Sequence, residues 1–210
     1  MLNKKIIVVS DAFSDQFQGG AELTLESILE TAPEEIIRVQ SAKVDKDLIE
    51  RHSDDFWIFG NFSQLSRELL VSFVKREIKY SVFEYDYKYC KFRSPDIHKL
   101  AEKEDCDCHI QRHGKEVGLF LYKSTLLWWM SDAQKAFYEE KFNFLKNHEN
   151  SETLSSTFSE RDTLFMKSLY KLNKPKTKEY IILNSKFPIK NTAGCVSIAK
   201  ENNLEYKLVS

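Results

Sequence analysis

The sequence predicts an α/β protein with an open, mostly parallel twisted sheet and helices on both faces, followed by a partial second α/β unit. Three observations support this class. Residues 6–9 are apolar without polar alternation, which is typical of a strand buried on both faces. Strand and helix patterns then alternate, which favours parallel strands with right-handed crossovers. Finally, the polar, proline-bearing segment 173–178 reads as a linker between a domain at 1–172 and a new unit at 179–210.

The composition is that of an ordinary globular protein. Of 210 residues, 42% are hydrophobic and 30% charged, and the net charge is −1, so nothing favours nucleic acid or a membrane surface as partner. No apolar run approaches the roughly 18 residues that a membrane span requires. Four cysteines are too few for a disulfide scaffold and are expected as free thiols. A cytoplasmic location is the default expectation.

The first strand is followed by a glycine turn and a helix. After Ser10 and Asp11 the chain becomes polar, and it reaches Gly19 and Gly20 just before apolar residues recur at helical spacing. Such a turn presents unpaired backbone N–H groups and the positive end of a helix dipole, where a diphosphate can bind. Asp11 either orders this loop or contacts a ligand, and the first role is favoured. The pattern is neither a dinucleotide fingerprint nor a Walker A loop.

The rest of the first domain continues the alternation. Further strands are predicted at 35–40, 56–61, 79–83, 126–130 and 154–158. Between them we expect a short polar helix at 44–52, a helix N-capped by Ser63, a helix opened by a capping box of Ser131 and Gln134, and a helix capped by Ser159 with Asp162. Segment 88–122 has no clear periodicity, which is typical of a functional or locally stapled segment. The last unit is predicted as strand 180–183, helix 192–201 and strand 206–209.

Acidic and aromatic residues follow the fourth predicted strand, as Glu84, Tyr85, Asp86 and Tyr87. They lie at the same carboxyl edge as Gly19 and Gly20, where open α/β sheets bind ligands. Carboxylates can accept hydrogen bonds from hydroxyl groups, and aromatic faces can stack on sugar rings. An exposed polar turn without a function is the alternative.

Segment 88–122 carries the residue types of a zinc site, namely Cys90, Cys106, Cys108 and His109, with His98 and His113 nearby. The spacing argues against zinc, because Cys-x-Cys is less usual than Cys-x₂-Cys and the first cysteine is distant. Bound zinc would pin the segment structurally. The alternatives are free thiols and surface histidines, or a disulfide from Cys90 to one of the other two cysteines.

Two stretches resemble a known family. The run Ser10-Asp11-Ala12-Phe13, followed by Gly19-Gly20-Ala21-Glu22-Leu23, resembles the first strand and glycine loop of GT-B glycosyltransferases, in particular the retaining glycosyltransferase family 4, which includes sucrose and glycogen synthases. The resemblance implies a Rossmann-like acceptor-side domain. It also implies that catalysis needs no metal.

The segment after the linker looks like a variant of the loop that opens the family's second domain. That loop has Gly-Arg and then Lys-Gly; here Lys186 and Lys190 would stand for the cations that neutralise the donor diphosphate. Ser185 and Asn191 replace the glycines, and the cations are one residue closer, which puts Lys186 in more doubt than Lys190. The family's carboxylate pair would lie past Ser210, so we expect a truncated donor-side unit and weak or no activity from this chain alone.

The resemblance therefore implies a glycosyltransferase, or its N-terminal part, that moves a sugar from a nucleotide-sugar to an acceptor hydroxyl. Gly19, Gly20, Lys186 and Lys190 would bind the donor diphosphate, and Asp11, Glu84, Tyr85 and Asp86 the acceptor. A catalytic residue is not identified. The alternatives are a non-catalytic carbohydrate- or protein-binding module with the same fold, and a zinc-stapled nucleic-acid accessory protein, which the net charge of −1 disfavours.

Overall fold

The computed structural model describes residues 4–32, 35–172, 180–185 and 190–209. The chain divides into two compact units, Met1–Thr163 and Leu164–Ser210. This division falls inside the helix α7 (Glu160–Lys171). The predicted linker 173–178 lies outside the described residues.

The first unit is built on a six-stranded sheet in the order β2-β1-β3-β4-β5-β6, and every described strand pair is parallel. The strands are β1 (Ile6–Ser10), β2 (Ile36–Gln40), β3 (Phe56–Phe59), β4 (Tyr80–Glu84), β5 (Leu126–Trp129) and β6 (Ser151–Thr153). The predicted α/β class with an open parallel sheet is confirmed. Because β2 and β3 lie on opposite sides of β1, the strand order reverses between β1 and β3, which makes this point the topological switch.

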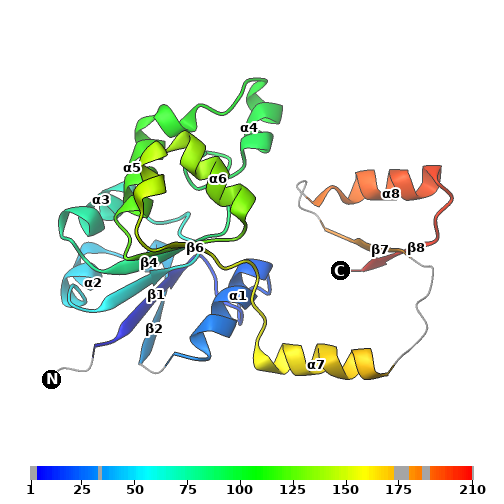
Figure 1. The fold of residues 1–210 in the computed structure, drawn as a ribbon, viewed down its shortest axis with the longest axis horizontal. Helices are drawn as coiled ribbons and strands as arrows, with labels where there is room; N and C mark the ends of the chain where they lie inside the picture. Colours follow the sequence, from blue (N-terminus) through cyan, green and yellow to red (C-terminus); the bar gives the residue numbers. More distant parts are fainter. Residues whose placement is uncertain (1–3, 33–34, 173–179, 186–189, 210) are drawn as a thin grey trace. The chain divides into compact units, whose positions relative to one another are not determined.

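Strand β1 is buried on both faces, as its apolar run predicts. Ile7 and Val9 belong to the larger core, whereas Val8 belongs to a second core on the opposite face. The larger core lies beneath α2 (Lys46–Arg51), α3 (Arg67–Lys75), α5 (Arg112–Tyr122) and α6 (Asp132–Lys141), and the second core beneath α1 (Gly20–Leu29). Figure 1 shows α3, α5 and α6 on one side of the sheet and α1 on the other.

Segment 88–122 is more regular than the sequence analysis expected. It contains α4 (Pro95–Glu102), a 3-10 turn (Cys108–Ile110) and α5. Ser94 caps α4 by accepting a hydrogen bond from the Ile97 amide at 3.3 Å, and Pro95 occupies the first turn, so a start signal was present. Helix α5 was missed because Gly114 is a poor helix former. There a Cβ would collide with the Cys108 carbonyl, so this close packing requires glycine.

Two of three predicted element ends differ from the structure. Ser63 does not cap a helix, because α3 begins at Arg67 after Ser66, and Ser63 instead donates to Asp11. The predicted strand 154–158 lies beyond β6, which ends at Thr153. The predicted cap at Ser159 is confirmed, since its hydroxyl accepts from the Asp162 amide at 3.1 Å.

Helix α6 begins as predicted, with Ser131 accepting from the Gln134 amide at 3.1 Å. The return bond of the capping box differs by one residue, because Gln134 Oε1 accepts from the Met130 amide at 2.9 Å.

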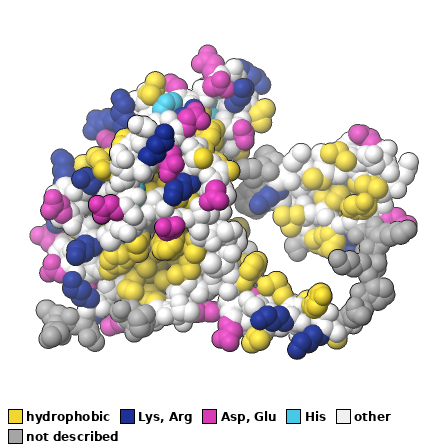
Figure 2. All heavy atoms as spheres, in the orientation of Figure 1, with side chains coloured by type: hydrophobic (Ala, Val, Ile, Leu, Met, Phe, Trp, Pro, Cys, Tyr) yellow, Lys and Arg dark blue, Asp and Glu magenta, His cyan; other side chains and the backbone are white. Residues whose placement is uncertain are grey.

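The second unit contains a parallel pair, β7 (Tyr180–Leu183) and β8 (Tyr206–Val209), joined through α8 (Thr192–Glu201), as predicted. Apolar residues of α7 are exposed, among them Phe165 and Leu169. Figure 2 shows yellow apolar atoms and dark blue basic atoms side by side along this helix. Among the helices that the structure describes, none is long and apolar enough to cross a bilayer.

Candidate functional site

The site begins at the switch point, where Asp11 directly follows β1. Its carboxylate accepts hydrogen bonds from the Ser41 hydroxyl, the Ser63 hydroxyl at 2.5 Å, the Ser63 amide at 3.1 Å and the Gln64 amide at 3.3 Å. Burial alone would raise the pKa of Asp11, but these donors outweigh it and hold the pKa below its ordinary value. Asp11 therefore stays ionised and joins the loops after β1, β2 and β3.

Arg93 connects three strand ends. Its Nε donates to Asp86 Oδ2 at 2.5 Å, its Nη2 donates to Asn61 Oδ1 at 2.9 Å, and its Nη1 lies 3.6 Å from Asp11 Oδ2. Asp11, Asn61 and Asp86 follow β1, β3 and β4 in turn, so they lie along one edge of the sheet. The Arg93 side chain is 36% exposed and its backbone has a φ of 55°, in the left-handed region. We call these four residues the edge network.

A buried ion pair between Glu84 and Lys88 lies next to the edge network. Glu84 is fully buried and accepts hydrogen bonds from the Lys88 amide at 3.0 Å, from Lys88 Nζ at 3.3 Å and from the Tyr138 hydroxyl at 2.8 Å. Lys88 Nζ also contacts Asp86 Oδ1 at 3.1 Å and lies over the Phe62 ring. Burial raises the pKa of Glu84, and the charge of Lys88 opposes that rise. Glu84 therefore fixes the turn after β4 and cannot contact a ligand directly.

Tyr85 differs from its neighbours because its hydroxyl is buried and, among the described residues, has no hydrogen-bond partner. Its ring stacks on Phe83 at 6.1 Å between centroids. Burial, reinforced by the negative charge of Glu22, raises the pKa of Tyr85 far above its ordinary value. The phenol is neutral and free to donate or accept a hydrogen bond, which is an unusual state for a buried polar group.

The glycine turn is asymmetric. A Cβ at Gly19 would collide with Glu22 Oε2 and the Phe17 ring, whereas a Cβ at Gly20 would meet open space. The Glu22 side chain thus folds back over Gly19, the residue that precedes α1, and Asn61 donates to its carboxylate at 3.4 Å. The Glu22 carboxylate therefore already lies at the N-terminal end of α1. The helix dipole, which would favour a bound diphosphate, also favours this carboxylate.

Of the two predicted lysines, Lys186 lies outside the described residues. Lys190 is exposed and belongs to the second unit. The structure also contains site residues that the sequence analysis missed, namely Asn61, Lys88, Arg93 and Tyr138. Asn61 ends the predicted strand 56–61 at the same edge, so the edge argument could have found it. Arg93 does not follow a predicted strand, so the sequence did not indicate its place at this edge.

A cavity of about 230 Å³ borders the edge network. Ser63, Lys88 and Arg93 line one part of it, and Cys90 and His113 line another. No carboxylate is among its lining residues in the described structure, so its walls are basic. It is large enough for a phosphate group or a single sugar ring.

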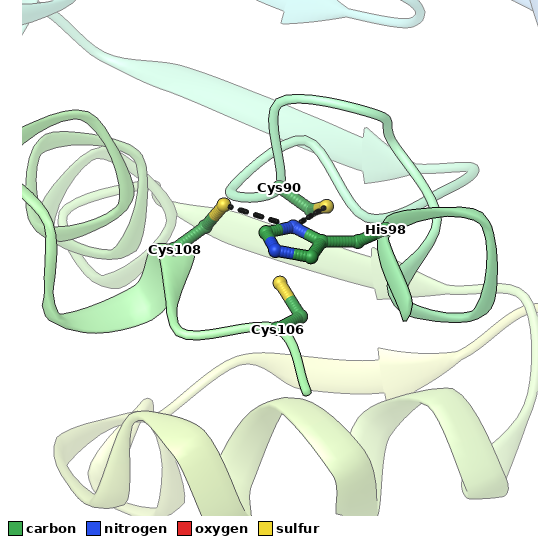
Figure 3. Close-up of side chains that lie close together, drawn as sticks. All are labelled: Cys90, His98, Cys106 and Cys108. Carbon is green, nitrogen blue, oxygen red and sulfur yellow. Dashed lines mark hydrogen bonds between the residues drawn. The ribbon is translucent and has the colours of Figure 1, made fainter. Parts of the chain in front are cut away.

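The predicted cysteine cluster is brought together, with a different histidine. Cys90, Cys106 and Cys108 converge on His98, and the four ligand atoms all lie within 4.8 Å of one another (Figure 3). The expected ligand His109 is not in this group, because its ring packs against Tyr89 and Phe142. His113 is also elsewhere, with Nε2 3.0 Å from the Lys88 carbonyl. All four cysteines are free thiols, so the alternative disulfide is absent from the described structure.

In comparisons with protein-family models, curated proteins and solved structures, none matches this chain.

Proposed function

We propose that this chain supplies the acceptor-side domain of a cytoplasmic glycosyltransferase, which moves a sugar from a nucleotide-sugar to an acceptor hydroxyl. The observation that carries the proposal is the edge network, in which Asp11, Asn61 and Asp86 from three strand ends meet at the half-exposed Arg93. Ligands of open α/β sheets bind at this edge, next to the switch point.

The chemistry of the network suits a ligand rich in hydroxyl groups. The side-chain oxygens of Asp11, Asn61 and Asp86 accept hydrogen bonds, and Arg93 donates them. Charge-assisted bonds of this kind are about twice as strong as neutral ones. A sugar acceptor presents hydroxyl groups in several directions and can engage both the acids and the arginine.

The donor diphosphate would bind near Gly20, whose surroundings are open. Gly19 is the less accessible of the two glycines, because Glu22 covers it. Displacement of the Glu22 carboxylate is therefore part of donor binding in this proposal.

A second candidate is a non-catalytic carbohydrate-binding module, and the position of Glu22 favours it. The Glu22 carboxylate lies at the N-terminal end of α1, where a diphosphate would bind, and repels that charge, whereas a neutral saccharide meets no such repulsion.

The test is calorimetric titration of the whole chain with a panel of nucleotide-sugars and of free saccharides. We expect a saccharide and a nucleotide-sugar to bind, and Arg93→Gln to weaken the saccharide by about tenfold or more, since hydrogen bonds to charged groups are involved. Arg112→Gln is the control, because that side chain is 84% exposed on α5 and pairs only with Glu116 among described groups. Saccharide binding without nucleotide-sugar binding would favour the second candidate. Folded protein that binds neither class would refute both.

A further inference from the structure

Four metal-ligand side chains meet beside the edge network, outside the residues that the proposed function uses. Cys90 lies in the loop after β4, His98 lies on α4, and Cys106 and Cys108 lie between α4 and α5. Figure 3 shows all three sulfur atoms directed toward the His98 ring. Cys90, His98 and Cys108 are buried and Cys106 is half-buried.

The distances match those around one tetrahedral ion. Zinc binds sulfur at about 2.3 Å and histidine nitrogen at about 2.0–2.1 Å, so a tetrahedral angle separates the two ligand atoms by about 3.6 Å. Cys90 Sγ lies 3.6 Å from His98 Nδ1, and Cys108 Sγ lies 3.5 Å from the same nitrogen. All four ligand atoms lie within 4.8 Å of one another, so they gather at one place.

The number and kind of the ligands indicate a structural rather than a catalytic site. Three cysteines and one histidine fill all four positions of tetrahedral zinc, so no position stays open for a substrate.

We propose that Cys90, His98, Cys106 and Cys108 bind one Zn²⁺ as a closed structural site. The ion holds α4 and the Cys106–Cys108 turn against the loop after β4. The Cys90 amide donates to the Tyr87 carbonyl at 2.8 Å, and the Arg93 amide donates to the Cys90 carbonyl at 2.8 Å. Anchoring Cys90 therefore anchors the turn that carries Asp86 and Arg93 to the sheet edge.

The first experiment measures metal content by mass spectrometry of the full chain after dialysis against a weak chelator. We expect one zinc per chain, and loss of most of it in Cys106→Ser and His98→Ala. The matched controls are Cys195→Ser, an exposed cysteine of the second unit, and His109→Ala, the nearby histidine outside the group. Both controls should keep the full zinc content. A wild-type chain without zinc, or one that carries iron instead, would overturn the proposal whatever the variants do.

The second experiment replaces zinc with Co²⁺, whose absorption reports geometry and ligands. Intense visible bands of tetrahedral cobalt with a thiolate charge-transfer band are expected, and Cys106→Ser should weaken the latter. A weak octahedral spectrum would contradict the site.

The effect on Arg93 is tested separately by hydrogen exchange with and without a strong chelator. Removal of zinc should increase exchange in 86–111 more than in β1 and β3, whereas equal exchange would refute the anchoring role. These readouts need no sugar ligand, so zinc binding can fail or hold independently of the glycosyltransferase proposal.

Discussion

Replacing Lys88 with methionine should destabilise the protein strongly, because it leaves Glu84 buried without its cation. The Lys88 side chain is 3% exposed and that of Glu84 is 0% exposed, with Nζ 3.3 Å from Oε2. Methionine keeps the apolar stem, which lies against the Phe62 ring. The change therefore removes charge with little loss of volume.

The expected magnitude follows from the partners that remain. Breaking a buried ion pair from one side costs about 3–5 kcal/mol. Glu84 keeps two other donors, the backbone amide of residue 88 and the Tyr138 hydroxyl, and Asp86 keeps Arg93. We therefore expect the lower end, about 3 kcal/mol, which corresponds to a fall in Tm of about 6–12 °C for a chain of this size.

The pH dependence of stability provides a second test of the Glu84–Lys88 ion pair. Burial raises the folded-state pKa of Glu84, so its protonated form is the one that folding favours. The stability from this group is present at low pH and is lost as the pH rises through the folded pKa. Without Lys88 to oppose the effect of burial, the defect of Lys88→Met should grow as the pH rises.

The assay is thermal and urea unfolding of wild type, Lys88→Met, Glu84→Gln and the double variant, followed by circular dichroism with zinc held constant. The double variant should recover about 2 kcal/mol relative to Lys88→Met, since neither buried charge is then left alone. A Lys88→Met variant within about 1 kcal/mol of wild type, or no recovery in the double variant, would refute the reasoning.

Three further predictions concern other parts of the site. Asp11→Asn should lower the free energy of unfolding by about 2–4 kcal/mol near neutral pH, because it weakens charge-assisted hydrogen bonds. Because the pKa of Asp11 is lowered, this loss should shrink as the pH falls through that pKa, and a loss that is constant with pH would contradict the prediction. Gly114→Ala should lower Tm and zinc content together, because a Cβ there collides with the Cys108 carbonyl, and unchanged values of both would count against this packing. Tyr138→Phe should lower the free energy of unfolding, measured with urea, by about 1–3 kcal/mol, because it removes a hydrogen-bond donor from the buried Glu84. An unchanged free energy of unfolding would contradict this prediction.

The proposed zinc ligands illustrate what a local sequence pattern can miss. The three cysteines are recognisable from the sequence, but their spacing is unusual for zinc and His109, not His98, is next to Cys108 in the chain. His98 lies on α4, a helix that Ser94 and Pro95 begin, and the packing of that helix brings its ring to the three sulfur atoms. The ring of His109, next to Cys108 in sequence, packs instead between Tyr89 and Phe142.

The sequence by itself determined the alternation of strands and helices, the burial of β1 on both faces and the sheet edge at which Asp11 and Asp86 lie. These follow from hydrophobic periodicity and chain direction, which are local properties. Only the tertiary structure decided the strand order, the burial of Glu84 and the meeting of Arg93 with three strand ends. Such contacts join residues far apart in the chain, and their partners are set by how helices pack on the sheet, which no spacing along the sequence encodes.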